Sequence, residues 1–120
     1  MAILATNAFE TYGKTLEDLE VVPVNEAAAA VVAIKAAASG KKVLVMAVGL
    51  TMRAAGTLSF RLIDNTVITG PMEFVEGGGF ALANTGVPHF FSALSGGLEL
   101  SIGVSGADGF VTILEVTPAG

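Results

Sequence analysis

The chain of 120 residues contains no cysteine, no tryptophan, one tyrosine and one histidine. Without cysteine it can form no disulfide, no thiol nucleophile and no thiolate zinc site. Because His89 is the sole histidine, a metal site with two or more imidazoles is excluded. No serine or carboxylate stands near His89 in a recognisable catalytic spacing. We therefore expect no cofactor, no metal and no enzymatic activity, and we expect His89 to make a local hydrogen bond.

Charge is also scarce. Only 14% of the residues are charged and 52% are hydrophobic, whereas a typical soluble domain has about 25% charged residues. The net charge of −5 argues against nucleic-acid binding, which needs a basic face. The longest apolar run, residues 27–38, is interrupted by Lys35 and is shorter than the roughly 20 residues of a membrane span. Since no membrane partner is expected, a protein neighbour is the better explanation of the excess apolar surface.

Residues 70–102 predict the fold class. Short apolar pieces alternate with glycine clusters there, which is typical of strands joined by tight turns. Leu98, Leu100, Ile102 and Val104 alternate with polar or small residues, so they predict a strand with one buried and one solvated face. Antiparallel sheets commonly have one face exposed to solvent, whereas parallel sheets are usually buried on both faces. We predict an all-β fold, an antiparallel, jelly-roll-like β-sandwich with about eight strands.

Glycine and aspartate mark the predicted turns. Residues 107–109, Ala-Asp-Gly, predict a tight hairpin between strands at 98–105 and 110–116. Residues 77–79, three glycines, lack the Gly-Lys-Ser/Thr of a phosphate cradle and are expected to be turn glycines. Asp64 with Asn65 offers too few oxygen ligands for calcium and is also expected to form a turn.

Residues 1–26 differ from the rest of the chain. They hold nearly half of its acidic residues, and their apolar residues follow no strand alternation. We predict an N-terminal arm with one helical turn capped by Thr15, then an edge strand at residues 19–24 that carries Pro23. A disordered tail is the alternative, although such tails usually lack aromatic and large aliphatic residues. The β-sandwich domain is expected to span residues 27–120.

Residues 27–50 carry the prediction of a subunit interface. Residues 27–38 fit a helix by their alanines and a strand by their β-branched residues, and we predict a strand. Residues 43–50 are apolar on both faces, which indicates a strand covered twice, once by its own core and once by a neighbouring subunit. An arm from the same chain would produce the same pattern. The predicted interface residues are Leu44, Met46 and Val48, with Phe90 and Phe91.

Several segments between residues 30 and 116 resemble a known family. They are built from turn glycines and alternating aliphatic residues, and they comprise residues 40–45, 58–60, 69–72, 80–82, 90–91 and 96–102. Together they resemble the small β-sandwich head decoration (cement) and minor capsid proteins of tailed bacteriophages. The resemblance implies a jelly-roll-like domain that forms homotrimers on the outside of an icosahedral shell, where major capsid subunits meet. It carries over no catalytic residues.

The expected function follows from this resemblance and from the low charge. We expect a structural virion protein, made in the host cytoplasm, whose partners are the major capsid protein and its own copies. The arm residues Phe9, Tyr12, Leu16 and Leu19 are expected to dock on the capsid. The alternative is a receptor- or carbohydrate-binding module of a tail fibre or spike. The absence of tryptophan and the single tyrosine weaken that alternative.

Overall fold

The computed structural model describes residues 7–64 and 66–118, which fold into a short helix, a 3-10 turn and seven strands. All the strand pairs are antiparallel, so the predicted all-β antiparallel fold is confirmed. In the described residues there are seven strands in one hydrogen-bonded sheet rather than about eight. The elements are α1 (Ala8–Tyr12), the 3-10 turn η1 (Leu16–Asp18), β1 (Glu20–Lys35), β2 (Lys42–Met52), β3 (Gly56–Arg61), β4 (Met72–Phe74), β5 (Gly79–Leu82), β6 (Phe90–Phe91) and β7 (Leu98–Val116). Residues 1–6 of the expected arm, and Asn65 of an expected turn, lie outside the described residues.

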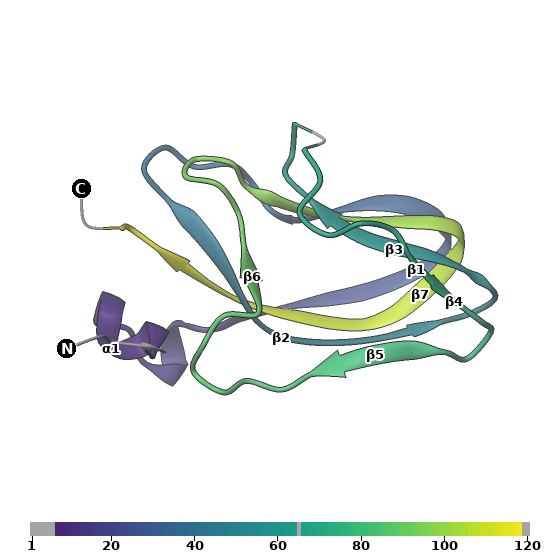
Figure 1. Cartoon of the computed structure of the whole chain (residues 1–120), viewed down its shortest axis with the longest axis horizontal. Helices are drawn as coiled ribbons and strands as arrows, with labels where there is room; N and C mark the ends of the chain where they lie inside the picture. The colour runs from purple at the N-terminus through teal and green to yellow at the C-terminus, as the bar shows by residue number, and fades with distance from the viewer. Residues whose placement is uncertain (1–6, 65, 119–120) are drawn as a thin grey trace.

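The single sheet folds into two layers because β1 and β7 bend back together. They pair along almost their whole length and turn at the end of the molecule opposite α1 (Figure 1). The first part of β7 pairs with β3 and the last part with β2, so these strands lie in different layers, here called the β3 layer and the β2 layer. The ends of β1 meet again, since Nζ of Lys35 lies 3.0 Å from Oε1 of Glu20. Strands that pass between layers through bends are one way to build a sandwich.

The bend in β7 lies at Val104. The register between β1 and β7 shifts between Ala28 and Ala30, where β7 contains an extra residue. Val104 has a φ of +75° and is 81% exposed. The alternation of residues 98–102 predicted that Val104 would be buried, and this prediction is wrong because a bulge rotates the bulged strand out of its alternation.

The tight hairpin predicted at residues 107–109 is also wrong. β7 runs through these residues without a break, between β1 on one side and β2 on the other. The Asp108 carboxylate accepts two hydrogen bonds from Arg53 instead of stabilising a turn. A Cβ on Gly109 would collide with the carbonyl oxygen of Gly49, so glycine permits close approach of β2. Pairing on both edges therefore overrides the local turn signal.

The main hydrophobic core lies between the two layers. The predicted inward residues Leu58, Phe60 and Leu62 are buried, which confirms the alternation expected for that strand. The rings of Phe60 and Phe90 pack with their centroids 4.8 Å apart. Each fully buried large aliphatic or aromatic side chain contributes about 1.5–3 kcal/mol, so this core accounts for most of the apolar stabilisation.

A bulge in β2 changes which face its residues occupy. Val45 pairs with Ile113 and Ala47 pairs with Thr112, so Met46 is an extra residue between two consecutive pairs. Val48 therefore lies in the main core, although it was predicted to share the second face with Leu44. Leu44 and Met46 point away from the main core and belong to a second cluster.

Candidate functional site

The N-terminal segment covers one end of the outer face of the β2 layer. Its apolar side chains form a second cluster with residues of β2 and β7: Ala8, Phe9, Tyr12 and Leu19 pack with Leu44, Met46, Leu114 and Val116. The predicted interface residues Leu44, Met46 and Val48 are all buried within the single chain. The prediction that another subunit covers them is therefore corrected, because the chain's own N-terminal segment covers Leu44 and Met46 and the main core encloses Val48.

Local hydrogen bonds hold this segment in place. The Asn7 side chain accepts from the backbone N–H of Phe9 at 2.8 Å and caps α1, which ends at Gly13 with a φ of +67°. The backbone N–H of Ala8 donates to the carbonyl oxygen of Gly86 at 2.7 Å, which ties α1 to the loop before β6. Thr15 occupies the N-cap position of η1 as predicted, and its backbone N–H donates to the Asp18 carboxylate at 2.7 Å.

The expected arm therefore has different limits and a different role within the single chain. β1 continues through Glu26 and Ala27, so the expected domain boundary lies inside a strand. Three of the four predicted capsid-binding residues, including Tyr12, pack on the chain's own sheet, and only Leu16 is largely exposed. Pro23 lies in β1, as predicted for an edge strand, since β7 is the one strand that pairs with β1 among the described residues.

The rest of the outer face of the β2 layer is open. Gly49 pairs with Ala81 of β5 and with Phe110 of β7, and directly opposed residues share a face. By the same rule Asp108, which pairs with Thr51 and with Asn25, lies on this face at the end near the bend. The surface that we call the open outer face is the remainder, and it carries no charged side chain, although the solvated face of an antiparallel sheet is usually polar. It comprises Val21, Pro23, Ala47, Gly49, Thr51, Gly79, Ala81 and Phe110, whereas Thr112, which lies opposite Val21 and Ala47, is buried.

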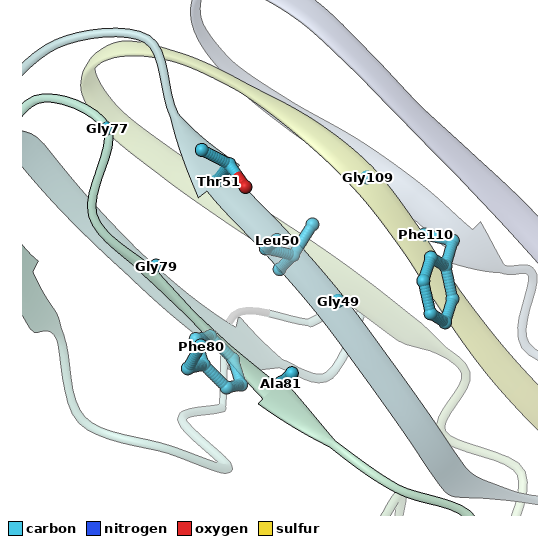
Figure 2. Close-up of a pocket in the computed structure, with 9 residues that line it drawn as sticks. All are labelled: Gly49, Leu50, Thr51, Gly77, Gly79, Phe80, Ala81, Gly109 and Phe110. Carbon is cyan, nitrogen blue, oxygen red and sulfur yellow. The ribbon is translucent and has the colours of Figure 1, made fainter.

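A shallow hollow of about 610 Å³ lies on this face. Figure 2 shows Gly49, Gly79 and Gly109 on three neighbouring strands, with Phe80 on one side and Phe110 on the other. The Phe110 ring covers Gly49 so closely that a Cβ there would lie 2.6 Å from the ring. A Cβ on Gly79 would collide with the carbonyl oxygen of Leu50. The backbone at Gly79 and the Phe110 ring are thus exposed at the hollow.

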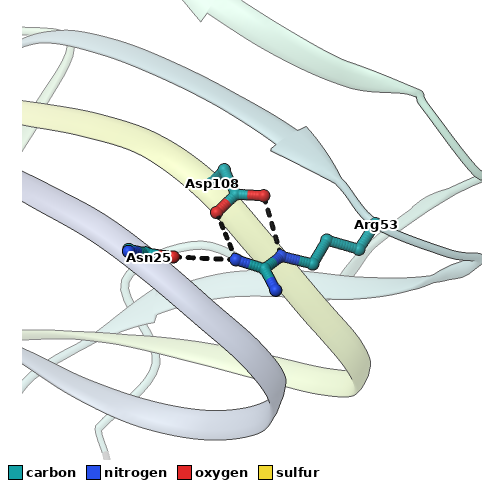
Figure 3. Close-up of polar contacts among 3 residues, drawn as sticks. All are labelled: Asn25, Arg53 and Asp108. Carbon is teal, nitrogen blue, oxygen red and sulfur yellow. Dashed lines mark hydrogen bonds and ion pairs between the residues drawn. The ribbon is translucent and has the colours of Figure 1, made fainter.

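A polar cluster bounds the open outer face at the end near the bend. Arg53 donates to both carboxylate oxygens of Asp108, at 2.8 and 2.7 Å, and to the Asn25 side chain at 2.7 Å (Figure 3). The hydrogen bond from Arg53 lowers the pKa of Asp108, and the same bond raises the pKa of Arg53. Because the two charges cancel, this border adds no net charge to the face.

A second hollow, of about 270 Å³, lies between α1 and β6, and we call it the α1–β6 groove. It brings together residues that were predicted for different roles, since Tyr12 was assigned to the arm, and Leu44 and Phe91 to the interface. Phe90 packs in the main core, whereas Phe91 is 52% exposed. The groove is lined by Ala8, Thr11, Tyr12, Lys42, Leu44, Pro88 and Phe91.

The residues considered for catalysis or metal binding make local contacts. Nε2 of His89 lies 2.7 Å from the carbonyl oxygen of Ala83, so it donates the local hydrogen bond that was predicted. Asp64 accepts hydrogen bonds from Thr66, which lower the pKa of Asp64, and Gly77 has a turn conformation with a φ of +76°. Within residues 7–64 and 66–118, no three His, Cys, Asp or Glu side chains are grouped to hold a metal ion.

The sequence of β2 contains a signal for the open outer face. Beyond Met46, the small residues Ala47, Gly49 and Thr51 alternate with larger buried ones, which marks an outer face built of small side chains. The described part of the chain contains no helix long and apolar enough to cross a membrane. No protein family, no curated protein and no solved structure matches this chain.

Proposed function

We propose that this protein is a capsid decoration (cement) protein of a tailed bacteriophage. It binds the outside of the icosahedral head as a homotrimer, contacts the major capsid protein and stabilises the contacts between capsomers. The observation that carries this proposal is the open outer face, which is mostly apolar, carries no charged side chain inside its Arg53–Asp108 border and is not covered by any other described residue. The resemblance of residues 30–116 to phage decoration proteins supplies the identity of the partner.

The composition of the open outer face favours contact with another protein. Covering it removes apolar area from water, which is favourable by about 25 cal/mol for each Å² buried. It also desolvates no charged group of the face itself. Four strands spaced about 4.8 Å apart give a face roughly 19 Å across. A square of that width covers about 360 Å², less than half of the about 800 Å² per partner of a standard interface. Three tethered copies raise the effective concentration of each contact, so a trimer compensates for a small patch.

The experiment is cosedimentation with empty heads of the phage that encodes the chain. Ala81→Glu places a carboxylate at an exposed position of the open outer face, so the fold is retained and burial against the head becomes costly. The matched control is Val67→Glu, which adds the same charge at an exposed position between β3 and β4. We expect Ala81→Glu to reduce binding at least tenfold and Val67→Glu to bind like the wild type.

Equal binding by the two variants would show that the open outer face does not meet the head. Failure of the wild-type protein to sediment with heads at any ratio would contradict the decoration role itself. Both variants are first compared with the wild type by circular dichroism, so that a loss of fold is not mistaken for a loss of contact.

The alternative, a carbohydrate-binding module of a tail fibre or spike, is favoured by one feature. Phe110 is 41% exposed at the hollow, and an exposed ring beside a hollow can stack on a sugar. A glycan array distinguishes the two functions. Binding of a defined glycan that is lost in Phe110→Ala would favour the alternative, and an array without hits beside binding to heads would favour decoration.

A further inference from the structure

The two ends of the molecule carry complementary surfaces. The molecule is 45 Å long, and α1 lies at one end of the long axis while β4 and the turn into β5 lie at the other (Figure 1). The α1–β6 groove occupies the first end. We call the other surface the β4 tip, and it comprises residues 73–76 with the neighbouring Val104.

The α1–β6 groove has apolar walls and one cation. Nζ of Lys42 lies 3.9 Å from the centroid of the Phe91 ring. In the part of the chain that the structure describes, Lys42 forms no ion pair, and no carboxylate lines the groove. At about 270 Å³ the groove is smaller than a typical small-molecule site of about 300–1,000 Å³. It therefore fits a protein side chain, preferably an apolar one with a carboxylate beside it.

The β4 tip presents that combination. Val75 is 73% exposed, and Glu73 and Glu76 on either side of it are exposed as well. Neither glutamate forms an ion pair with another described residue. Val104, which lines the same hollow as Val75, adds a second exposed aliphatic side chain. The tip is thus an apolar projection flanked by negative charge.

We propose that the α1–β6 groove of one copy receives the β4 tip of the next copy. Val75 enters the apolar groove, and Lys42 pairs with Glu73 or Glu76 of the neighbouring copy. Two different surfaces meet, so the contact is head-to-tail, and such contacts form a ring when the rotation closes. The inference rests on the homotrimer of the proposed function and names the surfaces that build it, with a ring of three copies as the closed form.

Charge favours this pairing over other contacts between copies. Each copy has a net charge of −5, so most surfaces of two copies repel each other. The contact of groove and tip sets a lysine against carboxylates at positions that stay partly exposed to solvent, so salt screens their attraction. Association should accordingly weaken as the salt concentration rises.

The experiment measures, by light scattering, the mass in solution of the full chain and of its charge-reversal variants. We expect the wild type to have three times the chain mass of 12.1 kDa. Lys42→Glu alone and the double variant Glu73→Lys with Glu76→Lys should each fall to the mass of one chain. A chain that carries all three reversals should recover the trimer, because the opposite charges face each other again.

Lys14→Glu is the matched control, since it makes the same charge change outside the groove and should leave the trimer intact. A trimer that persists in Lys42→Glu, or a triple reversal that stays monomeric, would overturn the proposal. If the mass were unchanged but Lys42→Glu no longer bound heads, the groove would belong to the capsid protein rather than to a second copy.

The mass and the binding to heads are measured separately, so the two proposals fail separately. A wild-type monomer that still sediments with heads would overturn the groove-and-tip contact and leave the decoration role standing. A trimer that depends on Lys42 but does not bind heads would support the groove-and-tip contact and contradict the decoration role.

Discussion

The outer face of the β2 layer has two halves that share strands but differ in side-chain size. Under the N-terminal segment, β2 and β7 present the large side chains of Leu44, Met46 and Leu114. Beyond Ala47 the same two strands and β5 present glycine, alanine and threonine, with Phe110 as the one large side chain. The first half is closed by the chain itself, whereas the second is left to solvent.

On the proposed function, this difference separates a half that stabilises the fold from a half that binds a partner. Large side chains fill the space under the N-terminal segment, so that half adds to folding free energy. The small side chains of the open half pack against no covering segment of the described chain. They would allow the surface of another protein to come close to the backbone of the sheet. The covered half is therefore expected to respond to truncation by loss of stability, and the open half by loss of binding.

The largest expected effect tests this contrast directly. Met46→Ala leaves a cavity in the covered half and should lower the free energy of unfolding by about 2–5 kcal/mol. Thr51→Ala, at an exposed position of the open half, should change it by less than about 0.5 kcal/mol. Denaturant unfolding of both variants measures the difference, and equal effects would show that the halves do not differ in this way.

The glycines of the open half are expected to be unequal. Gly109→Ala forces a Cβ against the backbone of β2 at a φ of +141° and should cost about 1–3 kcal/mol. Gly49→Ala meets only the Phe110 ring, which can rotate away, and should cost less. Thermal unfolding measures both effects. A larger loss of stability in Gly49→Ala than in Gly109→Ala would contradict this expectation.

The N-terminal cover is tested by Tyr12→Ala. Because Tyr12 is only half-buried over the second cluster, the loss should be about 1 kcal/mol. The variant should also expose part of the apolar face beneath and increase the fluorescence of a hydrophobic dye. Unchanged stability and unchanged dye binding would indicate that α1 does not close this half.

The smallest effect concerns the polar border of the open half. The pKa of Asp108 is lower in the folded than in the unfolded chain, because Arg53 donates hydrogen bonds to its carboxylate. Its contribution to stability is therefore present above the ordinary aspartate pKa of about 3.9 and is lost as the pH falls through the folded value. The melting temperature of the wild type should exceed that of Asp108→Asn at pH 6, and the difference should shrink towards pH 2. A constant difference over this range would contradict the linkage.

Much of the fold could be predicted from the sequence, and the failures have physical causes. Alternation placed Leu58, Phe60 and Leu62 correctly because β3 has no bulge and one dry face. It failed at Val48 and at Val104, since each follows or occupies a bulge that depends on pairing with a distant strand.

The candidate site could be predicted only in part. The sequence indicated that β2 is covered twice. Of the two phenylalanines predicted for the subunit interface, Phe90 packs in the main core and Phe91 is exposed, so an interface at Phe91 stays a prediction. It could not indicate which chain supplies the cover over Leu44, because that depends on how α1 lies in space. The open outer face joins Gly49, Gly79 and Phe110, which are far apart in the sequence and meet only through strand pairing.

The most direct test of the account is hydroxyl-radical footprinting of Phe110 in the free protein and on phage heads. The account predicts that Phe110, which is 41% exposed in the single chain, is oxidised in the free chain and several-fold less when the protein is bound. The exposed Val67, which lies outside both the open outer face and the N-terminal segment, serves as the internal reference. Equal oxidation of Phe110 in both states would contradict the claim that another protein covers this face.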